Sequence, residues 1–109
     1  MRIAWLLVAV GVVFEIGFAS CLKLSAGFSK PLPTLGVAVF GAVSLFSLAH
    51  AMRWIDAAPA YAVYTGLGAT GTAIVAAVAL GESLTPVRAL AIAAIISGAV
   101  VLALTGAAE

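Results

Sequence analysis

The sequence predicts an all-α integral membrane protein in which each chain contributes four transmembrane helices. Of its 109 residues, 65% are hydrophobic and only 8% are charged, whereas a typical soluble domain has about 25% charged residues. The mean hydropathy is +1.29. The apolar residues form runs close to the roughly 20 residues that a helix needs to cross a bilayer. These runs are continuous, whereas the strands of a membrane barrel would alternate apolar and polar residues.

The first predicted helix spans about residues 3–22 and is interrupted only by Glu15. A signal peptide is the alternative for this run, but Glu15 would break its apolar region and further apolar runs follow. The second predicted helix spans about residues 35–51. Pro31 and Pro33 come just before it. They mark the entrance of this helix, because proline suits a helix entrance better than a helix interior.

The third predicted helix spans about residues 57–80, and the fourth spans about residues 87–104, with Pro86 near its first turn. The connections between the four runs are short, so neighbouring helices are expected to be antiparallel. We therefore expect residues 1–109 to form a single transmembrane domain without an attached soluble domain.

Basic residues give almost no preference for one orientation in the membrane. Arg2 and Arg53 lie on one predicted face, and Lys23, Lys30 and Arg88 lie on the other. Basic residues normally mark the cytoplasmic side, so a chain this balanced is expected to insert in both orientations. A weakly favoured single orientation, or one that a partner chain sets, is the alternative.

Charge and composition exclude several classes of function. A net charge of +1 without a basic stripe argues against a nucleic-acid partner. Cys21 is the only cysteine, so neither an internal disulfide nor a cysteine metal cluster is expected. Residues 66–71 match the dinucleotide pattern GxGxxG, but they lie inside a predicted membrane span without the strand that gives this pattern its meaning. The sequence therefore predicts no enzyme, cofactor or metal site.

Glu15 is the acid whose position is unusual. The other acids, Asp56, Glu82 and Glu109, fall in loops or at the terminus. Glu15 lies about twelve residues into the first helix, roughly 18 Å at 1.5 Å per residue, which is near the midplane of a hydrocarbon core about 30 Å thick. An acid at this depth costs on the order of 3 kcal/mol by insertion scales. We therefore expect Glu15 to face a cavity and to have a functional role.

Proton and cation are expected to compete for this carboxyl group. Apolar surroundings favour the neutral acid, whereas a cation in the same cavity favours the carboxylate. Such competition is the minimum chemistry of an antiporter. The alternative is a protonated Glu15 that only holds helices together by hydrogen bonds.

Four other side chains are candidates for the same cavity. Phe18 lies on the face of Glu15 and offers a ring to a bound cation, with ordinary packing as the alternative. Tyr61 and Tyr64 share one stripe and need hydrogen-bond partners, of which a carboxylate is one. An interfacial aromatic belt is the alternative, particularly for Tyr61. Ser44 on the second helix either reaches the cavity or bonds to its own backbone.

Small residues indicate two further features. Gly66 and Gly68 predict either a flexible hinge in the third helix or a close-packing face. Ala91, Ala94 and Gly98 form a stripe that suits association between chains, with packing inside one chain as the alternative. Because four helices barely enclose a pathway, we expect a two-fold dimer with both mid-membrane glutamates in one cavity.

Together these segments resemble the small multidrug resistance family of bacterial inner-membrane transporters. Residues 14–16, 22–23 and 27–30 with Pro33 resemble its first helix and loop, and residues 60–68 resemble its third-helix signature. Residues 81–83 and the spacing of Ala91 and Gly98 resemble its last loop and dimerisation helix. The resemblance implies proton-coupled export of small organic cations by an antiparallel dimer, with Glu15 as the shared proton and substrate site.

The resemblance extends to the subtype that exports guanidinium. The features that favour it are Thr65, the glycine-rich run 66–71, residues 81–83 and Ser44. Phe18 and Tyr64 stand where tryptophan is usual, and Val12 stands where glycine is usual. A planar guanidinium pairs well with a carboxylate, so guanidinium and substituted guanidiniums are the expected substrates. Broad export of quaternary ammonium cations is one alternative, and a non-transporting or heterodimer-only subunit is another.

Overall fold

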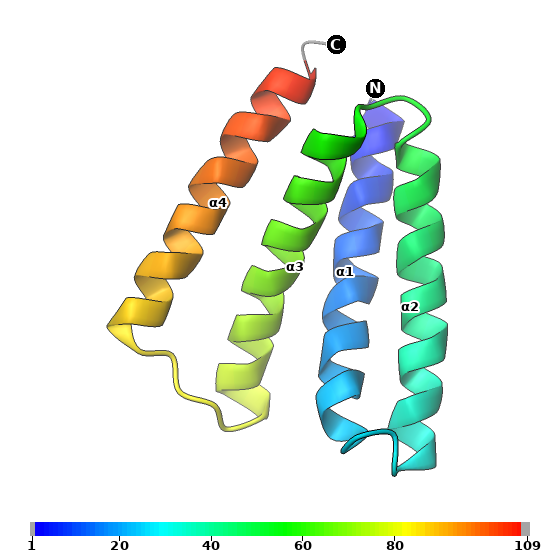
Figure 1. The fold of residues 1–109 in the computed structure, drawn as a ribbon, viewed down its shortest axis with the longest axis vertical. Helices are drawn as coiled ribbons and strands as arrows, with labels where there is room; N and C mark the ends of the chain where they lie inside the picture. Colours follow the sequence, from blue (N-terminus) through cyan, green and yellow to red (C-terminus); the bar gives the residue numbers. More distant parts are fainter. Residues whose placement is uncertain (1, 108–109) are drawn as a thin grey trace.

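The computed structural model describes residues 2–107 and contains four helices joined by short loops (Figure 1). Their bounds are α1 (Arg2–Leu24), α2 (Pro31–Ala51), α3 (Ala57–Ala79) and α4 (Pro86–Ala107). Each of them is long and apolar enough to span a membrane, which confirms the predicted all-α membrane class. Glu109 and the side chain of Arg2 lie outside the part of the molecule that the structure describes.

The second helix begins earlier than predicted. It starts at Pro31 rather than near Leu35, and its first turn contains Pro33 as well. A proline in the first helical turn loses no intrahelical hydrogen bond, because the first N–H groups of a helix have no carbonyl partner. Sequence reasoning therefore placed the two prolines just outside a helix that they in fact begin.

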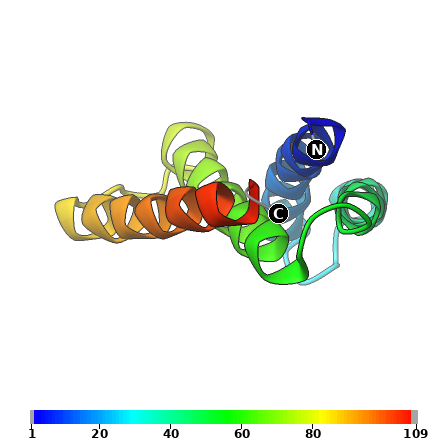
Figure 2. The ribbon, with the colours of Figure 1, turned by 90° about the horizontal axis from the view of Figure 1, so that it is seen from above.

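The four helices form a thin, open layer rather than a closed bundle. The molecule measures 43 × 33 × 16 Å. Successive helices run in opposite directions, and α1 lies between α2 and α3 (Figure 1). Within the described residues α4 packs against α3 alone, and Figure 2 shows it at the outer edge of the layer. Many large apolar side chains are consequently exposed, for example Val78 and Leu32, as is expected where lipid is the solvent.

Glycines allow α1 and α2 to approach closely. A Cβ atom at Gly41 would lie 2.9 Å from Cδ1 of Phe18, and one at Gly17 would lie 3.1 Å from Cδ2 of Phe40. Small residues permit this kind of backbone approach between membrane helices. Gly41 and Phe18, which are in contact, both line the cavity described below.

Candidate functional site

Glu15 lies midway along α1 and lines a cavity of about 210 Å³. The other residues around this cavity come from three helices: Phe18 of α1, Gly41 and Leu45 of α2, and Tyr61 and Tyr64 of α3. Four of the five side chains predicted for a shared site therefore meet at one cavity.

The fifth predicted residue, Ser44, reaches the site indirectly. Tyr64 donates its hydroxyl proton to Oε1 of Glu15 at 3.0 Å. Ser44 Oγ lies 2.5 Å from the same tyrosine hydroxyl and donates to the carbonyl oxygen of Gly11 at 2.7 Å. Ser44 is 0% exposed and Tyr64 is 3% exposed, so this line of oxygen atoms is shielded from the surroundings.

The carboxyl group of Glu15 has no charged partner among residues 2–107. Its hydrogen bond from Tyr64 is neutral, and the one ion pair in this part of the chain joins Lys23 to Glu82 at 3.9 Å, at a loop. A carboxylate that lacks a basic partner can take either a proton or an incoming cation.

Aromatic rings line the cavity beside the carboxyl group. The rings of Tyr61 and Tyr64 lie 6.1 Å apart at an interplanar angle of 31°. Tyr61 is 54% exposed, so an approaching ligand can reach it, whereas Tyr64 is buried. Cations bind to aromatic faces within about 6 Å of the ring centre.

Gly68 lies directly against Glu15. A Cβ atom at Gly68 would be 2.7 Å from Cγ of Glu15. A Cβ atom at Gly66 would be 3.0 Å from Cγ2 of Ile95 on α4. Both glycines therefore serve close packing, and α3 continues unbroken through them. A hinge at Gly66 and Gly68 stays a prediction.

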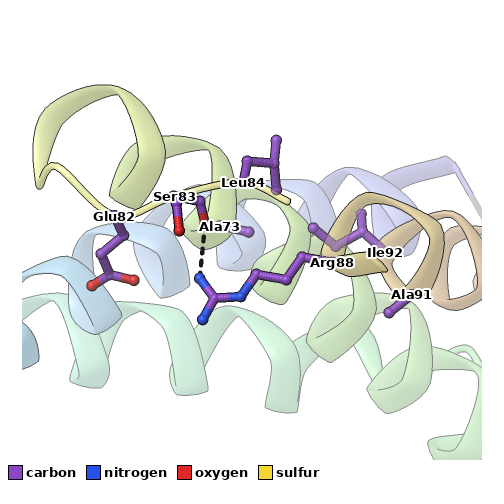
Figure 3. Close-up of a pocket in the computed structure, with 7 residues that line it drawn as sticks. All are labelled: Ala73, Glu82, Ser83, Leu84, Arg88, Ala91 and Ile92. Carbon is purple, nitrogen blue, oxygen red and sulfur yellow. Dashed lines mark hydrogen bonds between the residues drawn. The ribbon is translucent and has the colours of Figure 1, made fainter. Parts of the chain in front are cut away.

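The stripe predicted for association between chains is not filled by packing inside one chain. Ala94 and Gly98 line a groove of about 400 Å³ between α3 and α4. Among the described residues, no atom beyond the adjoining backbone of α4 would lie within 4 Å of a Cβ atom at Gly98. Ala91 lines a separate pocket at the α3–α4 loop (Figure 3). Association of chains through this stripe stays a prediction.

The loop pocket in Figure 3 is chemically different from the cavity at Glu15. Its basic residue, Arg88, donates from Nη1 to the carbonyl oxygen of Ser83 at 2.8 Å (Figure 3). Glu82 lines the same pocket and approaches Lys23. These charges lie at the end of the helices, as expected for residues at a membrane surface.

Sequence reasoning did not identify Gly41 and Leu45 as cavity residues. Their signal was their position on α2, because both lie three or four residues from another residue near the cavity: Gly41 precedes Ser44 by three, and Leu45 follows Gly41 by four. The contact between Gly68 and Glu15 had no sequence signal, since helix packing decides which glycine faces which side chain.

Comparison with known proteins matches this chain to one protein family and to several guanidinium exporters. The family model described as Small Multidrug Resistance protein matches residues 3–96. A guanidinium exporter of Yersinia pseudotuberculosis is 43% identical over 95 residues, which is 87% of this chain and 91% of that protein. Guanidinium exporters of Escherichia coli strain K12 and Citrobacter freundii are 37% and 35% identical over 102 residues, which is 94% of this chain and 97% of each relative.

Proposed function

This chain belongs to the small multidrug resistance family, and we propose that it exchanges protons for guanidinium and substituted guanidiniums across the bacterial inner membrane. Its family and its relatives identify it as a multi-pass membrane transporter of small cations. The observation that carries the finer proposal is the half-buried carboxyl group of Glu15, which accepts a hydrogen bond from the neutral hydroxyl of Tyr64 in a cavity with aromatic walls.

The chemistry of the cavity favours a planar cation. A carboxylate accepts two parallel hydrogen bonds from a guanidinium group, which a quaternary ammonium ion cannot donate. The rings of Phe18 and Tyr61 line the same cavity as the carboxyl group of Glu15 and suit the face of a flat cation.

Exchange follows from the use of one carboxyl group for two ligands. A guanidinium ion displaces the proton of Glu15, and a proton arriving from the other side displaces the guanidinium ion. Because neither step leaves an unpaired carboxylate in the low-dielectric cavity, each state avoids the cost of a lone buried charge. A transporter that opens alternately to each side then converts a proton gradient into export.

We infer that the working unit is an antiparallel homodimer. Three features support this: the layer is thin, α4 packs on α3 alone within the described residues, and Tyr61 is exposed at the cavity. A second copy would cover the open side and bring a second Glu15 to the same cavity. Ala91, Ala94 and Gly98 offer a close-packing stripe for that contact. A heterodimer with a related chain would use the same surfaces.

Uptake into proteoliposomes tests the substrate class. With an inside-acidic pH gradient, we expect guanidinium to accumulate at least about tenfold faster than tetraethylammonium, because hydrogen bonds to a charged group contribute on the order of 1.5–3 kcal/mol each. Protein-free liposomes provide the background. Faster uptake of tetraethylammonium would favour the broad-specificity alternative. Uptake of neither cation, restored by adding a related chain, would identify a heterodimer-only subunit.

A further inference from the structure

A continuous line of hydrogen bonds runs from Glu15 back to its own helix. It passes from the carboxyl group to the hydroxyl of Tyr64 at 3.0 Å, from there to Ser44 Oγ at 2.5 Å, and from Ser44 to the carbonyl oxygen of Gly11 at 2.7 Å. In an α-helix the carbonyl of residue 11 also accepts the backbone N–H of residue 15. The line therefore begins and ends on one turn of α1.

The number of protons available on these groups decides which group donates in each hydrogen bond. Tyr64 and Ser44 have one hydroxyl proton each, whereas the line contains three contacts between oxygen atoms. Three hydrogen bonds form together only when Glu15 is protonated. In that state Glu15 donates to Tyr64, Tyr64 donates to Ser44, and Ser44 donates to Gly11.

When Glu15 loses its proton, Glu15 and Tyr64 exchange the roles of donor and acceptor. Tyr64 must then donate to the carboxylate, so its oxygen can only accept from Ser44. If Ser44 turns to donate to Tyr64, its bond to Gly11 is lost. If Ser44 keeps that bond, two hydroxyl oxygens face each other at 2.5 Å without a proton between them. Either outcome leaves the carboxylate state with one hydrogen bond fewer.

We propose that Ser44 is a positioning residue that favours the protonated, substrate-free state of Glu15 through Tyr64. This role rests on the proposed exchange of a proton for guanidinium at Glu15. Ser44 does not line the cavity, since it is fully buried behind the tyrosine. Binding of guanidinium then turns the hydroxyl of Ser44 away from Gly11, because keeping that bond would leave two unbonded hydroxyl oxygens 2.5 Å apart. This turn loosens a contact between α1 and α2.

The residues that form these hydrogen bonds are tightly packed, so their hydroxyl groups can turn while the residues themselves stay in place. A Cβ atom at Gly11 would lie 3.3 Å from the Ser44 carbonyl oxygen and 3.3 Å from Cε1 of Tyr64, so the three residues are tightly placed. The titratable side chains that face Glu15 from α3 are Tyr61 and Tyr64. In the dimer proposed above, the Glu15 of the second copy is a further titratable group at this cavity, and it is the same in the wild type and in each variant. Within the described residues α2 presents no ionisable side chain to this cavity, and α4 does not contact α1.

Ser44→Ala tests the proposal through the pH profile of guanidinium binding. In the wild type, binding falls as pH falls, because protons compete for Glu15. Removing Ser44 takes away two hydrogen bonds from the protonated state and one from the carboxylate state. We therefore expect the pH of half-maximal binding to move lower by about 0.4–1 unit, which corresponds to one net hydrogen bond. The measurement is guanidinium binding to the purified, reconstituted protein at several pH values.

Ser47→Ala is the matched control. Ser47 is also buried on α2, one turn from Ser44, but it takes no part in the line to Glu15. Its variant should keep the wild-type profile. In a Tyr64→Phe background, Ser44→Ala should no longer move the midpoint, because the two residues act as a unit. An unmoved midpoint in Ser44→Ala, or an equal shift in Ser47→Ala, would overturn the proposal.

A second measurement uses the wild-type protein and needs no stable variant. In a sample with carbonyl-labelled glycine, solid-state NMR should show the Gly11 carbonyl losing a hydrogen bond when guanidinium is added. Gly66 is the internal reference, because its carbonyl accepts the hydroxyl of Thr70 at 2.9 Å. A Gly11 signal that does not change while guanidinium binds would overturn the role of Ser44. Absence of guanidinium binding at every pH would instead refute the proposed function.

Discussion

Replacing Glu15 by glutamine is expected to abolish proton-driven accumulation of guanidinium in proteoliposomes. The amide has nearly the same shape and still accepts the hydroxyl of Tyr64, which lies 3.0 Å from Oε1, so the fold should persist. The glutamine side chain cannot be negatively charged and cannot exchange a proton. Loss of one partner of a buried charge pair costs about 3 kcal/mol or more, which is about a hundredfold in affinity. Uptake of labelled guanidinium under a pH gradient provides the measurement.

Glu82→Gln is the control for this experiment. Glu82 is the acid at the α3–α4 loop, 3.9 Å from Lys23, and exposed pairs of this kind contribute about 0–1 kcal/mol. Its variant should transport guanidinium at a rate close to that of the wild type. Coupled transport that survives in Glu15→Gln at the wild-type rate would show that Glu15 is structural.

Replacing Gly68 by alanine is expected to weaken guanidinium binding by about ten- to hundredfold. The added methyl group would lie 2.7 Å from Cγ of Glu15, and Cγ is too close to the backbone to move without moving the carboxyl group. Misplacement of a reacting group by about 1 Å can cost a hundredfold. Alanine is also a better helix former than glycine by about 1 kcal/mol, so α3 should remain folded. Binding of guanidinium and thermal stability should be measured together.

Gly17→Ala is the control for Gly68→Ala. It adds a methyl group near Glu15 without displacing the Glu15 side chain. Gly17 is only two residues from Glu15, but its methyl group would meet the ring of Phe40 at 3.1 Å, outside the cavity. A flexible ring can yield by the few tenths of an ångström required, so this variant should bind guanidinium normally. Equal affinities in Gly68→Ala and the wild type would show that the close contact does not position Glu15.

The membrane fold could be predicted because composition and run length decide it. Few charges and four long apolar runs leave only helices that satisfy their own backbone in lipid, and the structure has those helices. The start of α2 was misplaced because prolines are excluded from helix interiors but accepted in the first turn. Sequence patterns place such boundaries poorly, since the first turn makes few hydrogen bonds of its own.

The candidate site could be predicted in part, because the position of a residue along a membrane-spanning helix gives its depth in the membrane. Glu15 and Tyr64 were expected to meet, and their hydrogen bond is present. Ser44 fits neither of its two alternatives in full: its hydroxyl bonds to α1 instead of its own helix, and it contacts the site only through Tyr64. The partners of individual glycines could not be predicted, because helix rotation and crossing decide whether Gly68 faces Glu15 or lipid.

Movement of protons during guanidinium uptake tests the exchange at Glu15 most directly. Vesicles that contain the protein and an internal pH indicator are equilibrated at equal pH on both sides, and guanidinium is then added outside. Each guanidinium ion that enters should release protons from Glu15 to the outside, so the internal pH should rise in proportion to uptake. Guanidinium that enters at the full rate while the internal pH stays constant would contradict a carboxyl group shared between proton and cation.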